Sequence, residues 1–528
     1  METAVALKVL GGLGLFLLGI HHLTEGLKSF AGDSLRRALQ TAVSGRFSAV
    51  VSGALFTAAI QSSTATILTV IGFVSAGLIT FTQAIGVTIG ATFGTTSTPW
   101  LIAVFGFRVR IADGALPLLG VGALLWLVAS GRLRSLGAIL AGFGLLFTGI
   151  DFLQNGMKGV TWNLESFAGT GLVARWVLAG IGIVMTIVMQ SSSAAAATTL
   201  VALDAGSLTF EQACAMVVGQ SIGTAATSAL AALGGGLAVR RTAIAHVTFS
   251  LVVGVLGVVF LGPLVHAAEW LGGWLGDLDG VLALAAFSSI FKLAGVLVFY
   301  PWLDRFAQFI SRIAGSGEET AVSHLEPAVA RTGGTIALEA AWRAILEVAR
   351  GGVDTVRASL AGERVAYDPP TQAIRQIEQF LESVSLDTID PSLAESRLVR
   401  ICHALDELST LQQELARVPA AVTDWQPPAA YGAGSRALAT WLDATKNPEI
   451  AASAAVASSV EEARGQMGRE RKVERERLLG DVALRRIPAA TAAAALESLR
   501  WSDSALQGAG QLIESLHAAR GEWERDVA

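Results

Sequence analysis

From Phe47 to Phe107 the chain contains no Asp, Glu, Lys or Arg. One membrane-spanning helix needs about 20 predominantly apolar residues, so this stretch is long enough for several passes. The whole chain has the same character, with 52% hydrophobic residues, 15% charged residues and a mean hydropathy of +0.56. We therefore predict an all-α polytopic membrane protein that also has a soluble part.

Two polar clusters interrupt the apolar sequence. The second cluster begins 129 residues after the first. Its members repeat those of the first almost residue for residue. The first cluster is Gln61, Ser62, Ser63 and Thr64, and the second is Gln190, Ser191, Ser192 and Ser193.

Other motifs recur at the same interval, which indicates an internal duplication. Thr80-Phe81-x-Gln83 returns as Thr209-Phe210-x-Gln212, and Gly90-x-x-x-Gly94-Thr95 returns as Gly219-x-x-x-Gly223-Thr224. We expect repeat one at about 5–135, repeat two at about 136–265, and an extra final span at 280–301. In membrane transporters, paired repeats usually enclose the substrate pathway.

The apolar segments divide into single spans and two longer units. Single spans are predicted at 5–25, 112–130, 136–155, 242–265 and 280–301, and the units 47–106 and 176–239 each contain one polar cluster. Non-helical backbone at membrane depth is tolerated only where it is buried in protein or lines a cavity. We therefore predict re-entrant hairpins or interrupted helices at both clusters.

The distribution of Lys and Arg sets the expected orientation. Basic residues collect after the first span, near 132–134, near 240–241 and near 305–312, and these loops are cytosolic if the N-terminus lies outside. Arg108, Arg110, Lys158 and Arg175 then face outward, and the two repeats are inverted relative to each other. The first apolar segment is expected to be a retained span rather than a cleaved signal peptide.

The composition changes after Glu318, where charged, Ala-rich sequence with helical periodicity begins. Apolar residues recur at three- and four-residue steps between Leu398 and Leu415, and prolines divide the region into about six helices. We predict a transmembrane domain at 1–315 and a cytosolic helical bundle at 318–528, in a protein of the inner (cytoplasmic) membrane. The two cysteines, Cys214 and Cys402, do not indicate a disulfide framework or a zinc site.

All side chains of the two polar clusters are uncharged. Hydroxyl, amide and carbonyl oxygens can coordinate a sodium ion, and an anionic substrate can balance its charge. Because neither cluster contains Arg or Lys, the anion needs helix N-termini as donors, a role that suits phosphate. The predicted phosphate and sodium site is therefore Gln61, Ser62, Ser63, Thr64, Gln190, Ser191, Ser192 and Ser193. The alternative is a packing seam of small residues.

Further polar residues near the clusters form a second rank of sodium or pathway candidates. Threonine hydroxyls in membrane helices often bond only their own backbone, so the threonines are weaker candidates than the cluster residues. Lys292 is the ionisable residue deepest in a predicted span, and either a functional role or snorkelling of its long stem would explain it. These candidates are Thr92, Thr95, Thr96, Gln220, Ser221, Thr224 and Lys292, together with Ser97, Thr98 and Thr227.

With its paired Gln-Ser-Ser clusters, its two Gly-x-x-x-Gly-Thr segments and the stretch from Arg241 to Phe249, the chain resembles bacterial type II sodium/phosphate cotransporters. That resemblance implies inverted repeats whose hairpin tips bind phosphate and sodium. The tail at 318–528 resembles the PhoU-like domain fused to many members, which implies links to phosphate-signalling proteins. No metal ligands are assigned, although Asp406 and Glu407 are adjacent in this tail.

The predicted function is sodium-coupled secondary transport of inorganic phosphate across the bilayer. The alternatives are a membrane-anchored regulator of phosphate uptake, or a transporter or exporter of another small oxyanion. The sequence shows no nucleophile–base constellation, nucleotide loop or basic nucleic-acid patch, so an enzyme, a cofactor other than sodium and a nucleic-acid partner are not expected. Uptake versus export, sodium stoichiometry and homo-oligomer formation stay open.

Overall fold

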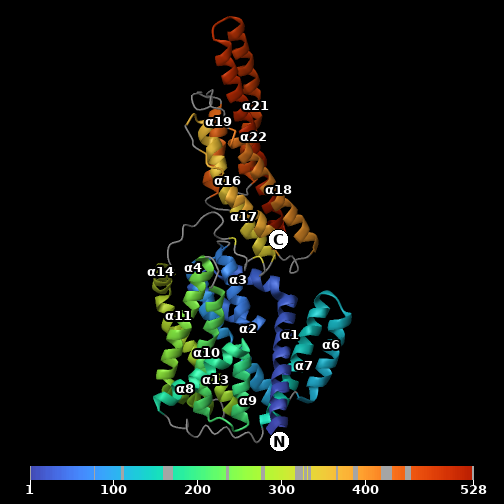
Figure 1. The fold of residues 1–528 in the computed structure, drawn as a ribbon, viewed down its shortest axis with the longest axis vertical. Coiled ribbons are helices and arrows are strands. Elements are labelled where there is room, and N and C mark those ends of the chain that lie inside the picture. The colour runs from blue at the N-terminus through green and yellow to red at the C-terminus, as the bar shows by residue number, and fades with distance from the viewer. Residues whose placement is uncertain are drawn as a thin grey trace. The chain divides into compact units, whose positions relative to one another are not determined.

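The computed structural model describes residues 2–75, 78–108, 112–157, 171–232, 237–274, 280–314, 325, 330, 334–363, 367–384, 391–417, 431–445 and 454–525. Within these residues all regular structure is helical (Figure 1), which confirms the predicted fold class. The chain divides into two units, Met1–Glu318 and Glu319–Ala528. Arg110, Lys158, the join at 315–317 and residues 326–327 lie outside the described residues.

The first unit contains long apolar helices and several short ones. Its elements are α1 (Glu2–Ala42), α2 (Arg46–Ile60), α3 (Ser63–Ser75), α4 (Phe81–Gly94), α5 (Ser97–Leu101), the π-helix η1 (Ile102–Arg108), α6 (Ala112–Val128), α7 (Gly131–Met157), α8 (Leu172–Met189), α9 (Ser192–Asp204), α10 (Phe210–Ala232), α11 (Leu237–Val259), α12 (Leu261–Trp274), α13 (Gly280–Phe299), η3 (Tyr300–Trp302) and α14 (Leu303–Ala314).

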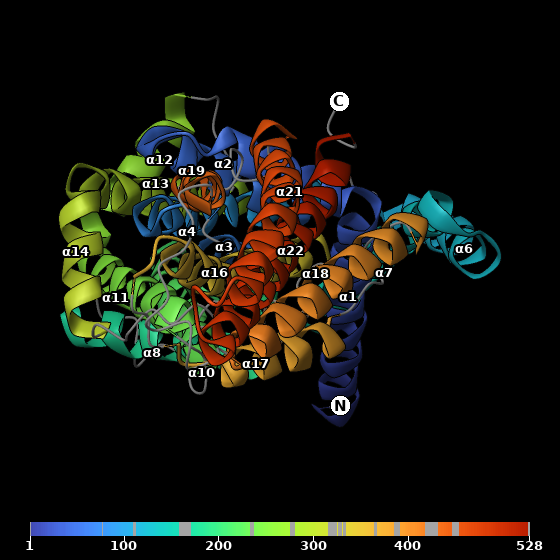
Figure 2. The ribbon, with the colours of Figure 1, turned by 90° about the horizontal axis from the view of Figure 1, so that it is seen from above.

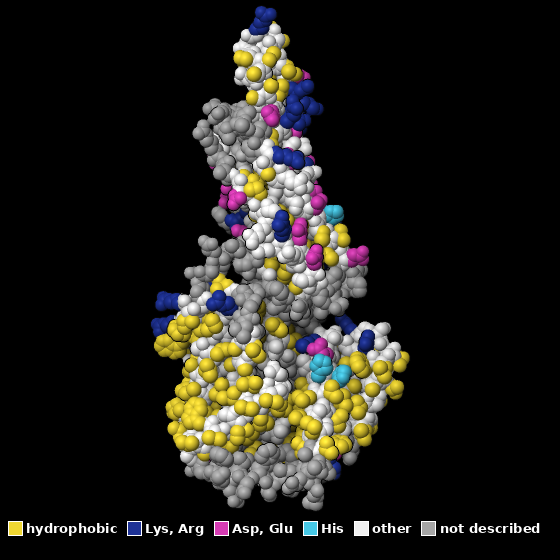
Figure 3. Space-filling view, in the orientation of Figure 1, with side chains coloured by type: hydrophobic (Ala, Val, Ile, Leu, Met, Phe, Trp, Pro, Cys, Tyr) yellow, Lys and Arg dark blue, Asp and Glu magenta, His cyan; other side chains and the backbone are white. Residues whose placement is uncertain are grey.

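Six helical segments of the described chain are long and apolar enough to cross a membrane. They are Leu7–Phe30, Gly131–Gly156, Leu172–Met189, Phe210–Leu230, Leu237–Val259 and Gly280–Ala314. Shorter apolar helices are Arg46–Ile60, Ser63–Val74 and Gly114–Val128. The last of these lies at the single span predicted for 112–130 but is too short to count among the six. On the face seen in Figure 3, hydrophobic side chains cover the first unit broadly, as expected for a surface that contacts lipid. The unit is a multi-pass membrane protein.

One predicted span has the wrong limits. A single span was expected at 242–265, but α11 ends at Val259 and α12 begins at Leu261. Pro263 explains the break, because a proline ring clashes with the carbonyl four residues earlier, which here belongs to Val259. Hydropathy alone did not distinguish this break from a continuous apolar run.

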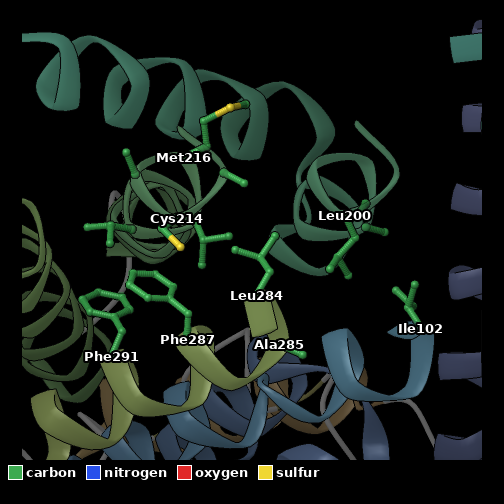
Figure 4. Packing of buried hydrophobic residues seen from close by; sticks show 14 of the residues in the cluster. Ile102, Leu200, Cys214, Met216, Leu284, Ala285, Phe287 and Phe291 are labelled. Carbon is green, nitrogen blue, oxygen red and sulfur yellow. The ribbon is translucent and has the colours of Figure 1, made fainter. Parts of the chain in front are cut away.

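The helices of the first unit form two groups. Helices α1, α6 and α7 lie together at one side, whereas α8, α10, α11 and α13 lie at the other (Figures 1 and 2). Between α9, α10 and α13 a buried core joins Leu200, Cys214, Met216, Phe287 and Phe291 (Figure 4). This core fixes the position of α13 against the two helices that follow the second polar cluster.

Glycines set the close packing of α2 on α4 and of α8 on α10. A Cβ atom on Gly90 would lie 1.9 Å from the Val50 carbonyl oxygen, and one on Gly219 would lie 1.9 Å from that of Ala179. Both pairs are related by the interval of 129 residues found in the sequence. The glycines of the repeated Gly-x-x-x-Gly-Thr motif therefore allow the backbones to approach closely.

The repeated Thr-Phe-x-Gln motif is a helix cap. Thr80 and Gln83 form a capping box at the start of α4, in which the Gln83 amide nitrogen of the backbone donates to Thr80 Oγ1 and the Thr80 N–H donates to Gln83 Oε1. Thr209 and Gln212 make the same two bonds at the start of α10. Such reciprocal bonds satisfy backbone donors that the helix leaves unpaired.

The second unit, Glu319–Ala528, is a separate helical body with six long helices in its described part. They are α16 (Gly334–Leu360), α17 (Thr371–Glu382), α18 (Pro391–Leu415), α19 (Gly432–Ala444), α21 (Ala454–Ala483) and α22 (Ala489–Arg525). The predicted apolar stripe on α18 is buried at Ile401, Leu405, Leu408 and Leu411. Between α16 and α22, Trp342 Nε1 donates to the Leu516 carbonyl at 3.1 Å.

Candidate functional site

Each polar cluster breaks a helix at its glutamine. Gln61 ends α2 and Gln190 ends α8, both in the left-handed region with φ of 60° and 52°. After each glutamine one further residue separates the two helices, so α3 begins at Ser63 and α9 at Ser192. The interrupted helices expected at both clusters are therefore present. A non-glycine residue in this region is unusual and marks these two turns as specific features of the fold.

The serine after each glutamine caps the next helix. Ser191 Oγ accepts a hydrogen bond from the Ala194 amide at 3.2 Å, and Ser62 Oγ accepts one from the Ala65 amide at 3.2 Å. The first amides of a helix have no intrahelical acceptor, so the N–H groups at Ser192 and Ser193 stay available to an anion. Ser62 and Ser191 thus shape the helix start.

A chain of hydrogen bonds links the first cluster to the second. Gln61 Nε2 donates to Ser97 Oγ at 2.9 Å, and Gln61 Oε1 accepts from Thr98 Oγ1 at 2.8 Å. Ser193 Oγ in turn donates to Thr98 Oγ1 at 3.3 Å. Thr98, a second-rank candidate from the sequence, therefore joins Gln61 to Ser193.

A polar cavity lies on the Ser193 side of this chain. Its empty space, which includes open solvent at its mouth, is about 280 Å³. Residues from the α4–α5 junction, α9, α10 and α13 surround it. They are Thr95, Pro99, Ser192, Ser193, Ala196, Val217, Gln220, Ser221, Ser288 and Lys292, and we call this space the Lys292 cavity.

Lys292 is the charged group of this cavity. The side chain is 8% exposed, and its Nζ donates to Thr95 Oγ1 at 2.7 Å. The described residues that line the cavity include no Asp or Glu. The ammonium thus lies at the cavity wall, against the Thr95 hydroxyl.

Gln220 supplies an acceptor without a partner. Its Nε2 donates to Thr199 Oγ1 at 2.7 Å, and the Thr199 hydroxyl itself donates to the Ala195 carbonyl, which fixes the orientation of the amide. Gln220 Oε1 is buried and has no hydrogen-bond partner among the described residues. A buried acceptor left unpaired is costly, so a ligand that donates a proton here would be favoured.

A second cavity lies on the Gln61 side and is mainly apolar. Its empty space, which also includes open solvent, is about 380 Å³. Gln61, Thr98, Thr24 and Ser193 are its polar lining residues, and the others come mainly from α1, η1 and α7. Ser193 lines both cavities, so the hydrogen-bonded chain of Gln61, Thr98 and Ser193 borders the second cavity and reaches the first.

The predicted residues thus divide by position. Ser192, Ser193, Thr95, Gln220, Ser221 and Lys292 meet at the Lys292 cavity. Thr92 and Thr224 bond backbone carbonyls of their own helices, at Thr88 and Ser221. Ser62, Ser63, Thr64, Thr96, Gln190 and Ser191 line neither of the two cavities, and the Thr227 side chain lies outside those described.

The two clusters are not equivalent in the fold. Gln61 is half-buried and bridges Ser97 and Thr98, whereas Gln190 is exposed and its Nε2 donates to the Ile187 carbonyl of its own helix at 2.6 Å. Thr199 and Ser288 were not predicted for the site, although one orients Gln220 and the other lines the cavity. Neither has a counterpart in a repeated motif, so the duplication gave no signal for them.

Helix breaks and a polar cavity inside an apolar multi-pass unit are typical of membrane carriers for small solutes. The family model described as Na+/Pi-cotransporter matches residues 15–155 and matches again at residues 156–272. The chain belongs to this family, as the resemblance in its sequence indicated. Helix α13 and Lys292 lie beyond both matched ranges.

Relatives support this membership. The chain is 32% identical over 300 residues to "Uncharacterized protein YqeW" of Bacillus subtilis (strain 168), covering 56% of this chain and 94% of the relative. It is 27% identical over 323 residues to "Putative inorganic phosphate export protein YjbB" of Salmonella typhimurium, and 28% identical over 309 residues to its namesake in Escherichia coli (strain K12). These matches cover 61% and 58% of this chain, and 58% and 55% of the relatives. No solved structure matches the chain significantly.

Proposed function

We propose that residues 1–315 form a secondary transporter of inorganic phosphate, with the anion bound in the Lys292 cavity. The cavity itself is the main support. It combines the N-terminus of α9, the hydroxyls of Ser192 and Ser193 and one ammonium group, and the described residues that line it include no carboxylate. Hydroxyls, free amides and a cation are the groups that bind a phosphate ion.

The proposal places sodium near Gln61 rather than in the Lys292 cavity. The family description names sodium together with phosphate. Gln61 Oε1 and Thr98 Oγ1 lie 2.8 Å apart, and Ser97 Oγ accepts from Gln61 Nε2 at 2.9 Å. These neutral oxygens are of the kind that suits a small hard cation. Since Thr98 also accepts a bond from Ser193 at the Lys292 cavity, occupation of one position can influence the other.

The remaining predictions of location and organisation are part of the same proposal. We infer inverted repeats, an inner-membrane location and a cytosolic second unit from the distribution of Lys and Arg. We infer a regulatory, PhoU-like role for residues 318–528 from the resemblance of their sequence, and their separate helical core is compatible with it. Among the residues that the structure describes, no group of three His, Cys, Asp or Glu is placed to hold a metal.

Removing the two serine hydroxyls tests the anion site. Ser192→Ala combined with Ser193→Ala should lower phosphate transport at least about tenfold, because a hydrogen bond to a charged group contributes about 1.5–3 kcal/mol. The measurement is flux of radiolabelled phosphate in proteoliposomes, with and without a sodium gradient. Ser135→Ala is the control, since its hydroxyl bonds only the Gly131 carbonyl of α7 at 3.5 Å. Wild-type flux in the double variant would exclude this cavity as the site.

Gln220 distinguishes phosphate from other small oxyanions. Phosphate carries a proton at neutral pH and can donate it to Gln220 Oε1, whereas sulfate has no proton to donate. Gln220→Leu should therefore reduce the preference for phosphate over sulfate by about tenfold or more, as expected when a buried polar partner is lost. The preference is measured by the inhibition of labelled phosphate uptake by unlabelled sulfate. If sulfate inhibits uptake by the wild-type protein as strongly as unlabelled phosphate does, the site does not select phosphate through Gln220.

A further inference from the structure

Lys292 has an incomplete set of partners for a buried ammonium group. It is the one charged residue of α13 (Gly280–Phe299). An ammonium group has three donors, and the structure gives Lys292 one hydrogen bond, to Thr95, and no ion pair among the described residues. Buried charges in proteins are normally paired, because an unpaired one is strongly disfavoured. The pairing charge is therefore expected to come from a ligand.

The acidic residues of the neighbouring cavity-lining helices lie at the helix ends. Glu211 precedes Gln220 by nine residues on α10, which corresponds to about 13 Å of helix. Asp204 follows Ser192 by twelve residues on α9, or about 18 Å. Glu211 also pairs with Arg175 at 2.9 Å, and Gln154 donates to Asp204 at 3.2 Å. Neither carboxylate is placed to neutralise Lys292.

Helix α13 holds the ammonium at a defined place on the cavity wall. Trp100 Nε1 donates to Ser289 Oγ at 2.9 Å, which ties α5 to α13 three residues before Lys292. Phe291, next to Lys292 in the chain, is 2% exposed and packs in the core shown in Figure 4. The helix therefore cannot easily turn the lysine away from Thr95 and the cavity.

We propose that Lys292 is a resident counter-cation for the anion in the Lys292 cavity and takes the place of a bound sodium ion there. This inference rests on the proposed phosphate site. A cation that is covalently part of the protein is present at all sodium concentrations. Phosphate binding to this cavity therefore does not require sodium. Any effect of sodium on transport arises at the separate oxygens around Gln61.

The charge of the substrate leads to a second measurable consequence. Lys292 stays with the protein, so in the absence of sodium each phosphate crosses the membrane with its own negative charge. A membrane potential then drives net flux, and an inside-negative potential drives phosphate outward. Proteoliposomes with a potassium gradient and valinomycin should show this dependence in buffers free of sodium.

The decisive experiment is equilibrium binding of radiolabelled phosphate to the purified full-length protein, in sodium chloride and in choline chloride. The wild-type protein should bind phosphate with similar affinity in both solutions. Lys292→Asn should bind at least about tenfold more weakly in choline chloride, because a charged hydrogen-bond partner is lost. Lys292→Arg, which keeps the charge, should bind without sodium.

The outcomes separate this inference from the proposed function. If wild-type protein binds phosphate only in sodium, the role of Lys292 is refuted and phosphate transport stands. If it binds phosphate in neither solution, both fail. Unchanged binding by Lys292→Asn without sodium also overturns the inference. Gel filtration checks that each variant is folded, and if Lys292→Asn does not fold, the comparison of the two salts with the wild-type protein decides.

Discussion

Phosphate transport should fall to background when Lys292 is replaced by Glu. Two unit charges about 5 Å apart interact by about 3 kcal/mol at an effective dielectric constant of about 20. Losing the attraction alone therefore costs more than about a hundredfold in affinity, and an ionised glutamate would add repulsion of similar size. Among the described residues that line the cavity, no other carries a positive charge that could compensate. Uptake of radiolabelled phosphate into proteoliposomes measures the effect.

Two further substitutions at Lys292 show whether charge is the cause. Lys292→Arg keeps the cation and should retain transport, whereas Lys292→Gln should give an intermediate loss. A monodisperse gel-filtration profile for all three variants separates an effect on binding from a loss of fold. Near-normal transport by Lys292→Glu would mean that phosphate does not pass beside this side chain.

Substitution of Gly219 should give the largest effect on folding. A Cβ at this position lies 1.9 Å from the Ala179 carbonyl oxygen, so Gly219→Ala forces the backbones of α8 and α10 apart. Overpacking of a well-packed contact typically costs about 1–3 kcal/mol, and here the clashing atom is backbone that has no rotamer to change. We expect a strong loss of folded protein in detergent and a lower thermal midpoint. Gly90→Ala, in the equivalent contact with Val50, should behave in the same way.

Gly180 provides the matched control on α8. A Cβ there has nothing within 4 Å. Gly180→Ala should leave the thermal midpoint unchanged or raise it, since alanine is favoured over glycine inside a helix by about 1 kcal/mol. Equal midpoints for Gly219→Ala and the wild-type protein would show that α8 and α10 do not pack as described.

Local sequence rules predicted much of the fold. The charge-free run and the apolar periodicity indicated a multi-pass helical protein, and six segments meet the length and hydropathy of a span. The Gln-Ser clusters predicted helix breaks, which the left-handed Gln61 and Gln190 produce. One boundary was wrong, at Val259 and Leu261, because a proline within an apolar run changes the hydrogen bonding but hardly changes the hydropathy.

The sequence by itself determined the class of protein, the positions of both helix breaks and the family. These properties depend on residues close together in the chain or on repetition along it. The tertiary structure alone decided which polar groups meet. It brought Lys292 to Thr95 across 197 residues, left Gln220 Oε1 without a partner and made Gln61 and Gln190 different despite their matching motifs. Such contacts depend on how helices from distant segments pack, which no local pattern encodes.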